Sequence, residues 1–590
     1  MPTLFSLGGI GEILIALALA LPLVMGLVAL RPVLAIRVSY LVPIAAIPAL
    51  ILSLSEPVTV TWNGLLLGAT FASGGSAAVW LFFTATLWLC ASWFGAYYMA
   101  HDSNSPRYTF FFLWAMAGNF GLILARDPVG FFTSFALMSV LSYGLIIHDG
   151  KPASRVAGRV YLGMALLGEI LQFAAMSMLF FPIIGKIGVI NFQSLEMLPP
   201  PGALVVGLLI AGFGIKAGLP GLHVWLPMAH PVAPTPASAV LSGSMIKAGL
   251  LGWMAFLPLG RMALPDASMI LIILGLTGAV TAALIGVLQS NPKAVLAYSS
   301  VSQMGLITTG IGVGLGYPAS WPMLKWAVAA YAAHHAFAKC LLFLAVGLKT
   351  TRPLAGWERT VFWGGVLFAA LALIGAPLTS GAYVKVLLKD GIVASSFPAA
   401  GSVVTILTFA ATGTALLMIR YSVTLRRLAF DEHHEMARGA WIPWLILLAM
   451  VMAFTPMFIR ELYAQHILTA QLVISWLKSL WPPALGAVLY ASIHFLWIRL
   501  RWRVIQIPQG DLYHLLCWIP THVHHVRGTA GNAVRRTGKM YAGATISLIN
   551  RAAEKSRQFL EFIESRLAGW SIGGVAAVLV GVLIFWLSLQ

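Results

Sequence analysis

Residues 207–253 read GLLIAGFGIKAGLPGLHVWLPMAHPVAPTPASAVLSGSMIKAGLLGW and set long apolar runs around two lysines. The stretch is long and apolar enough for two membrane spans, because about 20 apolar residues cross the hydrocarbon core of a bilayer. A charged side chain at the bilayer centre costs about 2.5–3.5 kcal/mol on insertion scales. Lys216 and Lys247 must therefore face protein or internal water, so the stretch predicts two transmembrane helices inside a larger bundle.

The same apolar pattern continues along most of the chain. Of its 590 residues, 59% are hydrophobic and only 9% are charged, against roughly 25% charged in soluble domains. The sequence therefore predicts an all-α polytopic membrane protein with about sixteen spans. We expect these spans at 9–30, 38–54, 77–99, 108–125, 129–147, 161–184, 203–226, 236–258, 268–288, 295–314, 323–347, 360–394 (long and broken), 402–420, 441–459, 483–499 and 571–588.

The net charge of +18 reflects membrane topology and does not indicate a nucleic-acid partner. Loops after odd-numbered spans are basic, whereas 55–64 and 314–322 contain no Lys or Arg. Basic loops face the cytoplasm, so we expect a multi-pass protein of the bacterial inner (cytoplasmic) membrane with both termini outside. The first apolar run lacks signal-peptide features and is expected to be retained. The basic loop residues are Arg31, Arg37, Arg107, Lys151, Arg155, Arg159, Lys293, Lys349, Arg352, Arg359, Arg420, Arg426, Arg427, Arg499, Arg501 and Arg503.

Residues 508–568 interrupt the series of spans because they are too polar to cross a membrane. From Tyr541 onward their apolar residues recur on one helical face. Such a helix lies either on the cytoplasmic membrane surface or along a neighbouring subunit.

Four lysines and one glutamate are placed deep in apolar runs: Lys216, Lys247, Lys339, Lys385 and Glu169. A single lysine near a span end can extend its ammonium to the interface, but four together indicate a path. Glu169 is either a structural hydrogen-bond donor or a protonatable site. Lys389, one turn after Lys385, is assigned to the same pathway.

Glycines and prolines surround Lys216 and precede Lys385, which predicts interrupted helices in spans seven and twelve. Interrupted helices free backbone carbonyls and leave room for water at the midplane, as in ion-binding transporters. The two interruptions lie five spans apart, which hints at a five-helix repeat.

Four histidines extend the candidate pathway. His334 and His335 precede Lys339 by about one turn, and only one of them can share its face, because adjacent helix positions diverge by about 100°. A neutral imidazole there accepts and passes a proton near physiological pH. His223 and His230 flank the end of span seven and either act likewise or are core and capping residues.

The sequence predicts no catalytic site, cofactor or metal on this chain. Two histidine clusters, at 433–434 and 514–525, have no firm ligand geometry. The three cysteines, Cys90, Cys340 and Cys517, are far apart and form no CxxC pair. Phosphate loops, nucleophile elbows and haem-attachment motifs are absent from the sequence.

The stretch GIKAGLPGLHVWLPMAHPVAPTPASAVLSGSMIKAG resembles the core signature of the antiporter-like subunits of respiratory complex I, group 4 membrane-bound hydrogenases (including formate hydrogenlyase) and Mrp cation/proton antiporters. NPKAVLAYSSVSQMG and HHAFAKCLLFLAVG are similar to two further blocks in the same order. The resemblance covers roughly residues 75–430. Its HPVAPTPASAVLSG motif resembles the hydrogenase and formate-hydrogenlyase branch more than complex I.

The resemblance implies two inverted five-helix repeats with broken helices, in which protons hop through bound water. Lys216 and Lys247 match the first broken-helix lysine and the central lysine. His335 and Lys339 match the relay of span eleven, and Lys385 matches the terminal lysine. The C-terminal stretch looks like a lateral helix and a closing span. The implied division is 1–106 (spans 1–3), 107–260 (first repeat), 261–425 (second repeat), 426–507 (spans 14–15), 508–568 (amphipathic segment) and 569–590 (final span).

The chain departs from the family pattern in span five, where relatives carry a glutamate and this sequence has Ala136 in SFALMSVLSYGL. The pair that this glutamate usually forms with the lysine of the first broken helix, here Lys216, is therefore missing in its normal form. Our hypothesis is that Glu169, one helix later, replaces that glutamate as the partner of Lys216.

These features predict a proton-translocating subunit of a multisubunit redox complex of the hydrogenase or complex I type. The expected partners are other membrane subunits, protons or monovalent cations, and the lipid bilayer. The alternative is an ion-conducting subunit of a non-redox assembly, either Mrp-like or the cation-coupled partner of an inorganic-carbon uptake complex. A self-contained membrane enzyme is disfavoured because no bond-making site is present.

Overall fold

The computed structural model describes residues 9–66, 68–180, 191–192, 198–351, 354–430, 436–463, 480–500 and 510. The chain divides into two units, Met1–Thr61 with Thr70–Gln509, and Trp62–Ala69 with Gly510–Gln590. Of the second unit only 62–66, 68–69 and 510 are described. The predicted amphipathic segment, the final span and both histidine clusters lie outside the described residues.

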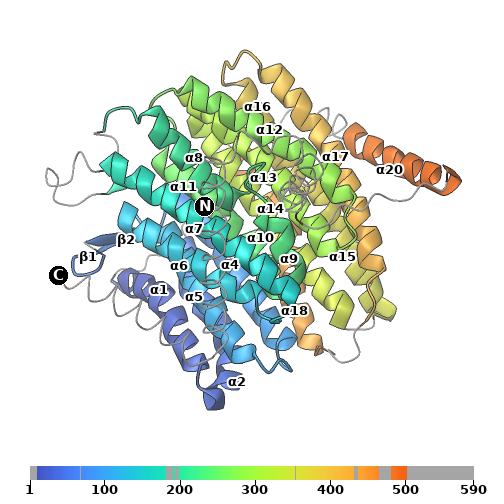
Figure 1. Ribbon diagram of the computed structural model, residues 1–590, viewed down its shortest axis with the longest axis horizontal. Coiled ribbons are helices and arrows are strands. Elements are labelled where there is room, and N and C mark those ends of the chain that lie inside the picture. The colour runs from blue at the N-terminus through green and yellow to red at the C-terminus, as the bar shows by residue number, and fades with distance from the viewer. Residues whose placement is uncertain are drawn as a thin grey trace, which may run out of the picture. The chain divides into compact units, whose positions relative to one another are not determined.

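The first unit is a bundle of α-helices (Figure 1). Ten helices in the described part of the chain are long and apolar enough to cross a membrane. The helices are α1 (Ile10–Ala29), α2 (Pro32–Leu41), η1 (Val42–Ala46), α3 (Ile47–Leu54), α4 (Ser76–Tyr98), α5 (Ser105–Leu124), α6 (Pro128–Ile146), α7 (Pro152–Phe180), α8 (Ala203–Ala217), α9 (Trp225–Val232), α10 (Thr235–Gly243), η4 (Met245–Lys247), α11 (Ala248–Phe256), α12 (Pro265–Val287), α13 (Pro292–Gly316), η5 (Pro318–Ser320), α14 (Trp321–Thr351), α15 (Gly356–Ile374), α16 (Ser380–Val393), α17 (Ala400–Arg426), η7 (Arg438–Ala440), α18 (Trp441–Tyr463) and α20 (Trp481–Leu500).

The expected all-α membrane fold is confirmed, while the count of sixteen spans and the two repeats stay predictions. Several helices extend past their expected bounds; for example, α7 begins at Pro152 and α17 ends at Arg426. The basic end residues of α7 and α17 therefore lie on helices and not in loops. One element is not helical: β1 (Thr59–Trp62) and β2 (Ala69–Ala72) form a two-stranded sheet, in a stretch rich in β-branched residues that favour strands.

Helix α14 forms the centre of the bundle. It contacts α4, α10, α13, α16 and α18, and the apolar part of its span is buried along its whole length. Figure 1 shows it enclosed by these helices. By contrast, α7 and α12 expose apolar side chains such as Ile170, Phe173 and Leu284, as helices on the lipid-facing rim of a bundle do. A polar residue in the buried stretch 327–348 of α14 therefore faces protein from every side.

Three spans are interrupted. Helix α8 ends at Gly218 (φ 78°) and α15 ends at Gly375 (φ 89°), both in the left-handed conformation that glycine adopts without steric cost. These are the interruptions that the sequence predicts in spans seven and twelve. The third was not expected: between α10 and α11 the backbone passes through the 3-10 turn η4, beginning at Ser244. A tight turn inside an apolar helix often marks a functional position.

Arg126 and Asp127 join the ends of two helices on the side predicted to lie outside. The Arg126 guanidinium donates to the carbonyls of Ile123, Leu124 and Ala125 at the end of α5. Burial lowers the pKa of Arg126 to about 10, so it remains charged at neutral pH. Asp127 accepts from the Gly130 amide and caps α6. Arg126 is thus a helix cap, which gives this basic residue a structural role at the end of α5.

Helices α12 and α13 make the most extensive contact in the bundle. They approach through Gly275 and Gly305, and a methyl group added at Gly305 would fall inside the van der Waals radius of the Gly275 carbonyl oxygen. Small residues that let two backbones meet are the usual basis of helix pairing in membranes.

We predict that Gly305→Ala destabilises the protein by about 1–3 kcal/mol, because overpacking forces the two backbones apart. Unfolding of the purified protein in mixed micelles of mild detergent and increasing SDS measures the change. The matched control is Gly364→Ala on α15, where nothing lies within 4 Å of the added methyl group; it should be neutral or slightly stabilising. Equal stability of the two variants would contradict the proposed glycine contact.

Candidate functional site: a row of buried lysines and histidines

Lys216 is the last-turn residue of α8, buried beside the interruption at Gly218. Its ammonium donates a 3.0 Å hydrogen bond to the Tyr161 hydroxyl on α7 and lies 5.6 Å from the centre of the Trp225 ring. The Trp225 indole N–H donates to the Ile215 carbonyl across the break, at 2.8 Å. The Tyr161 hydroxyl and the Tyr161 and Trp225 rings therefore stabilise the ammonium of Lys216. Cation–π contacts of this kind are strongest in desolvated sites.

Glu169 is buried on α7, two turns after Tyr161. Its carboxylate acts on Lys216 through space without a direct ion pair, and its Oε1 atom has no hydrogen-bond partner among the described residues. Ala136, at the position of the usual glutamate, is only half-buried. The structure thus brings Glu169 and Lys216 into one neighbourhood, with Tyr161 as the direct partner of the lysine.

Lys247 lies at the 3-10 turn between α10 and α11 and is 1% exposed. Its ammonium donates to the Ser242 carbonyl at 2.7 Å. The Ser242 hydroxyl meets the Ser300 hydroxyl of α13 at 2.6 Å. The unexpected turn thus brings the central lysine back onto a carbonyl of its own span.

Lys339 and His335 lie on the central helix α14, both completely buried. The Lys339 ammonium donates to the Leu296 carbonyl of α13 at 2.9 Å. Neither ring nitrogen of His335 has a hydrogen-bond partner within the described chain. The charges of Lys247 and Lys339 both lie close enough to act on His335, and Lys247 also acts on Lys339. These three side chains form one cluster at the middle of the bundle.

His334 faces the other way, toward the interruption between α15 and α16. Its Nδ1 atom lies 2.8 Å from the Ser380 hydroxyl at the start of α16. Lys385 on α16 reaches back across the break and donates to the carbonyls of Leu373 and Ile374, both at 2.8 Å. The two adjacent histidines therefore serve different neighbours, in agreement with their divergence on a helix.

Three further candidate residues, Lys389, His230 and His223, are also buried or half-buried in the bundle. Lys389 donates to the Thr408 hydroxyl of α17 at 2.7 Å. His230 is fully buried, stacks on Phe343 at 4.7 Å between ring centres, and acts electrostatically on Lys293 and Lys339. His223, also buried, packs edge-to-face on Tyr298.

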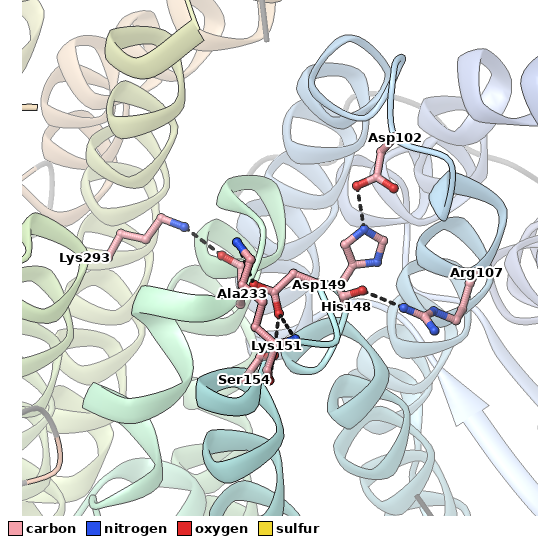
Figure 2. Close-up of polar contacts among 8 residues, drawn as sticks. All are labelled: Asp102, Arg107, His148, Asp149, Lys151, Ser154, Ala233 and Lys293. Atoms are coloured by element: carbon pink, nitrogen blue, oxygen red, sulfur yellow. Dashed lines mark hydrogen bonds and ion pairs between the residues drawn. The ribbon is translucent and has the colours of Figure 1, made fainter. Parts of the chain in front are cut away.

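The loops predicted to be cytoplasmic meet around the N-terminal ends of α5, α7 and α13 (Figure 2). His148 contacts Asp102 at 2.9 Å, and its carbonyl accepts from Arg107 at 2.6 Å. Lys293 donates to the Ala233 carbonyl at 2.7 Å. These contacts join the loop after the third span to the loop after the fifth, and the loop after the seventh span to the start of the helix after the ninth. The charge pattern assigns all four loops to one side of the membrane.

Sequence reasoning missed the neutral groups between the charges. Tyr161, Ser242 and Ser300 contact the lysines or one another, and none carries a charge that makes it stand out in an apolar run. A polar chain from Tyr331 through Gln303 to Thr414 was also missed. Within the described residues, His, Cys, Asp and Glu form no cluster of three that could hold a metal ion.

The transmembrane family model "NADH:quinone oxidoreductase/Mrp antiporter" matches residues 125–412. The chain is 26% identical over 406 residues to F(420)H(2) dehydrogenase subunit L of Methanosarcina mazei, covering 62% of this chain and 60% of that protein. It is 29% identical over 245 residues to Hydrogenase-4 component B of Escherichia coli K12, covering 40% and 36%. The chain thus spans less than two thirds of either relative.

A solved structure of the Mrp complex from Dietzia sp. DQ12-45-1b has the same fold. The two chains superpose with a TM-score of 0.71 at 20% identity, over 93% of this chain and 63% of the other. Lys216, Lys247, Lys339 and Lys385 all fall within the matched family region. Residues 125–412 of this multi-pass membrane protein therefore match the NADH:quinone oxidoreductase/Mrp antiporter family model, and the chain is similar to antiporter-like membrane subunits.

Proposed function

We propose that this chain is the proton-translocating, antiporter-like membrane subunit of a multisubunit redox complex. The observation that carries the proposal is the row of buried cations, Lys216, Lys247, Lys339 and Lys385, with His335 beside Lys247 and Lys339 and His334 turned toward Lys385. Intramembrane ionisable residues are rare and mark ion pathways by default. The redox assignment rests on the relatives, a dehydrogenase subunit and a hydrogenase component.

The electrostatics of the row favour stepwise movement of charge. None of the four lysines forms an ion pair with a carboxylate among the residues that the structure describes. Neighbouring ammonium groups therefore repel each other in a low-dielectric interior, where a charge interacts over several ångströms. A proton that arrives at one lysine disfavours a proton on the next, so charge moves along the row in alternation. Buried imidazole nitrogens without a protein partner are normally satisfied by ordered water, which also conducts protons.

One observation supports a second candidate function, which we propose as the alternative: an ion-conducting subunit of a non-redox assembly. Ala136 removes the carboxylate that the family uses in span five, so the lysine of the first broken helix lacks its usual partner. An Mrp-like cation/proton antiporter and the cation-coupled partner of an inorganic-carbon uptake complex both belong to this candidate. The likeness to the Mrp complex shows the fold alone.

The arrangement of the chain in its complex follows from the same proposal. The proposed division is 1–106, 107–260, 261–425, 426–507, 508–568 and 569–590, of which the boundaries at 106 and 425 fall inside α5 and α17. The gathering of basic loops in Figure 2 supports a common side for them, which we assign to the cytoplasm of a bacterial inner membrane with both termini outside. The row comprises Glu169, Lys216, His223, His230, Lys247, His334, His335, Lys339, Lys385 and Lys389.

Purification of the full-length, tagged chain in mild detergent tests the leading proposal. We expect iron–sulfur, nickel or flavin subunits to copurify, since a proton pump without a driving reaction has no source of energy. Mass spectrometry and metal and flavin analysis of the eluate identify them. If only other antiporter subunits or a zinc-dependent soluble protein copurify, the chain belongs to the second candidate.

We predict that Glu169→Gln lowers driven proton transport by roughly tenfold or more, because a positioned proton donor or acceptor contributes at least that much to a transfer step. Membrane vesicles energised by the complex's own driver and read with a pH-sensitive dye provide the measurement. Lys216→Ala should abolish transport, whereas the exposed carboxylate variant Glu12→Gln should retain it. Intact transport in Glu169→Gln together with loss in Lys216→Ala would show that Glu169 does not replace the missing glutamate.

A further inference from the structure

Two serine hydroxyls meet between the central lysines. Ser242 on α10 and Ser300 on α13 are completely buried, and their Oγ atoms lie 2.6 Å apart. Either oxygen can be the donor in this contact. The pair therefore has two states: either Ser242 donates to Ser300, which leaves the Ser300 proton on the Leu296 carbonyl, or Ser300 donates to Ser242.

Each hydroxyl adjoins the carbonyl that anchors one lysine. The carbonyl of Ser242 itself accepts from Lys247 at 2.7 Å. On the other side, Leu296 accepts from both the Ser300 hydroxyl at 3.0 Å and Lys339 at 2.9 Å. Two donors on one carbonyl oxygen are close neighbours. A continuous set of contacts thus leads from Lys247 through Ser242, Ser300 and Leu296 to Lys339.

A purely structural role explains this geometry poorly. A serine inside a helix usually satisfies its hydroxyl on a carbonyl of its own helix, as Ser244 does with Val240 at 3.1 Å. The Ser242 hydroxyl instead makes its contact across to α13. Ser299, next to Ser300, is equally buried, and its hydroxyl has no hydrogen-bond partner among the described residues. Burial on α13 by itself therefore does not dictate a contact with α10.

Resting on the proposed function, we propose that the Ser242–Ser300 hydroxyl pair is the proton connection between Lys247 and Lys339. The Lys247 ammonium turns from the Ser242 carbonyl to the Ser242 hydroxyl and gives a proton to Oγ, whose own proton passes to Ser300 Oγ. The Ser300 hydroxyl turns from the Leu296 carbonyl and gives its proton to the neutral Lys339 amine beside it. One proton moves in total, both serines end neutral, and their hydrogen bond has reversed direction. Rotation of the two hydroxyls resets the pair for the next proton.

The pair joins the two halves of the pathway. Lys216 and Lys247 form the first half of the row. Lys339 lies on α14 with His334, which contacts Ser380 at the start of α16, the helix that carries Lys385. Because the two lysines repel one another and are anchored on different carbonyls, a bridge of neutral hydroxyls lets charge pass without bringing the ammonium groups together.

The test uses the full complex in membrane vesicles, driven by its own partner reaction, with a pH-sensitive dye as readout. We expect Ser242→Ala and Ser300→Ala each to lower proton transport by about tenfold or more. The double variant should be no slower than either single variant, because one bridge is lost in all three. Ser299→Ala is the matched control and should stay within about twofold of the wild type.

Threonine variants separate a proton bridge from a packing role. Ser242→Thr and Ser300→Thr keep the hydroxyl and should retain most of the transport that the alanine variants lose. Wild-type transport in the alanine variants would overturn the proposal. Equal losses in the threonine and alanine variants would also overturn it, because packing would then be the cause.

Two further variants keep this test independent of the proposed function. Lys247→Ala and Lys339→Ala should each abolish transport. If they do so while the serine variants transport normally, only the serine bridge is wrong. If both lysine variants transport normally, the lysine row itself is not the pathway.

Discussion

An ammonium group in the apolar interior of this bundle needs oxygen atoms around it, and the backbone supplies most of them. Lys247, Lys339 and Lys385 all donate to backbone carbonyls. Transfer of an unpaired charge into an apolar medium costs many kcal/mol, and hydrogen bonds to dipoles offset part of this cost. The position of each lysine therefore depends on where the helices expose carbonyl groups.

The interruptions of the helices meet this need. A regular helix engages its carbonyls internally, and only its last four remain available. At Gly375 the helix ends inside the bundle, and Lys385 occupies the carbonyls that are released there. Lys216 uses a different solution at Gly218, with a tyrosine hydroxyl and two aromatic rings. The two broken spans thus stabilise cations by different means, although both are broken at a glycine.

Helix α14 connects these local arrangements. It is buried on all sides, so His334 and His335 can face two different neighbours and still be enclosed by protein. His334 is turned toward the break before α16, while His335 is close to Lys247 and Lys339. A helix at the rim of the bundle, such as α7, could present only one face to such partners. The central position of α14 is therefore what allows one helix to serve two parts of the row.

The sequence by itself determined the membrane fold, the breaks near Lys216 and Lys385 and the identity of the charged residues. Apolar length, helix-breaking residues and the cost of buried charge are local properties that a sequence displays directly. Only the tertiary structure decided that Tyr161 holds Lys216, that a turn at Ser244 bends Lys247 back onto Ser242, and that Ser242 meets Ser300. These contacts join residues on different helices through neutral groups, and their partners depend on how the helices pack, which the periodicity of one segment does not encode.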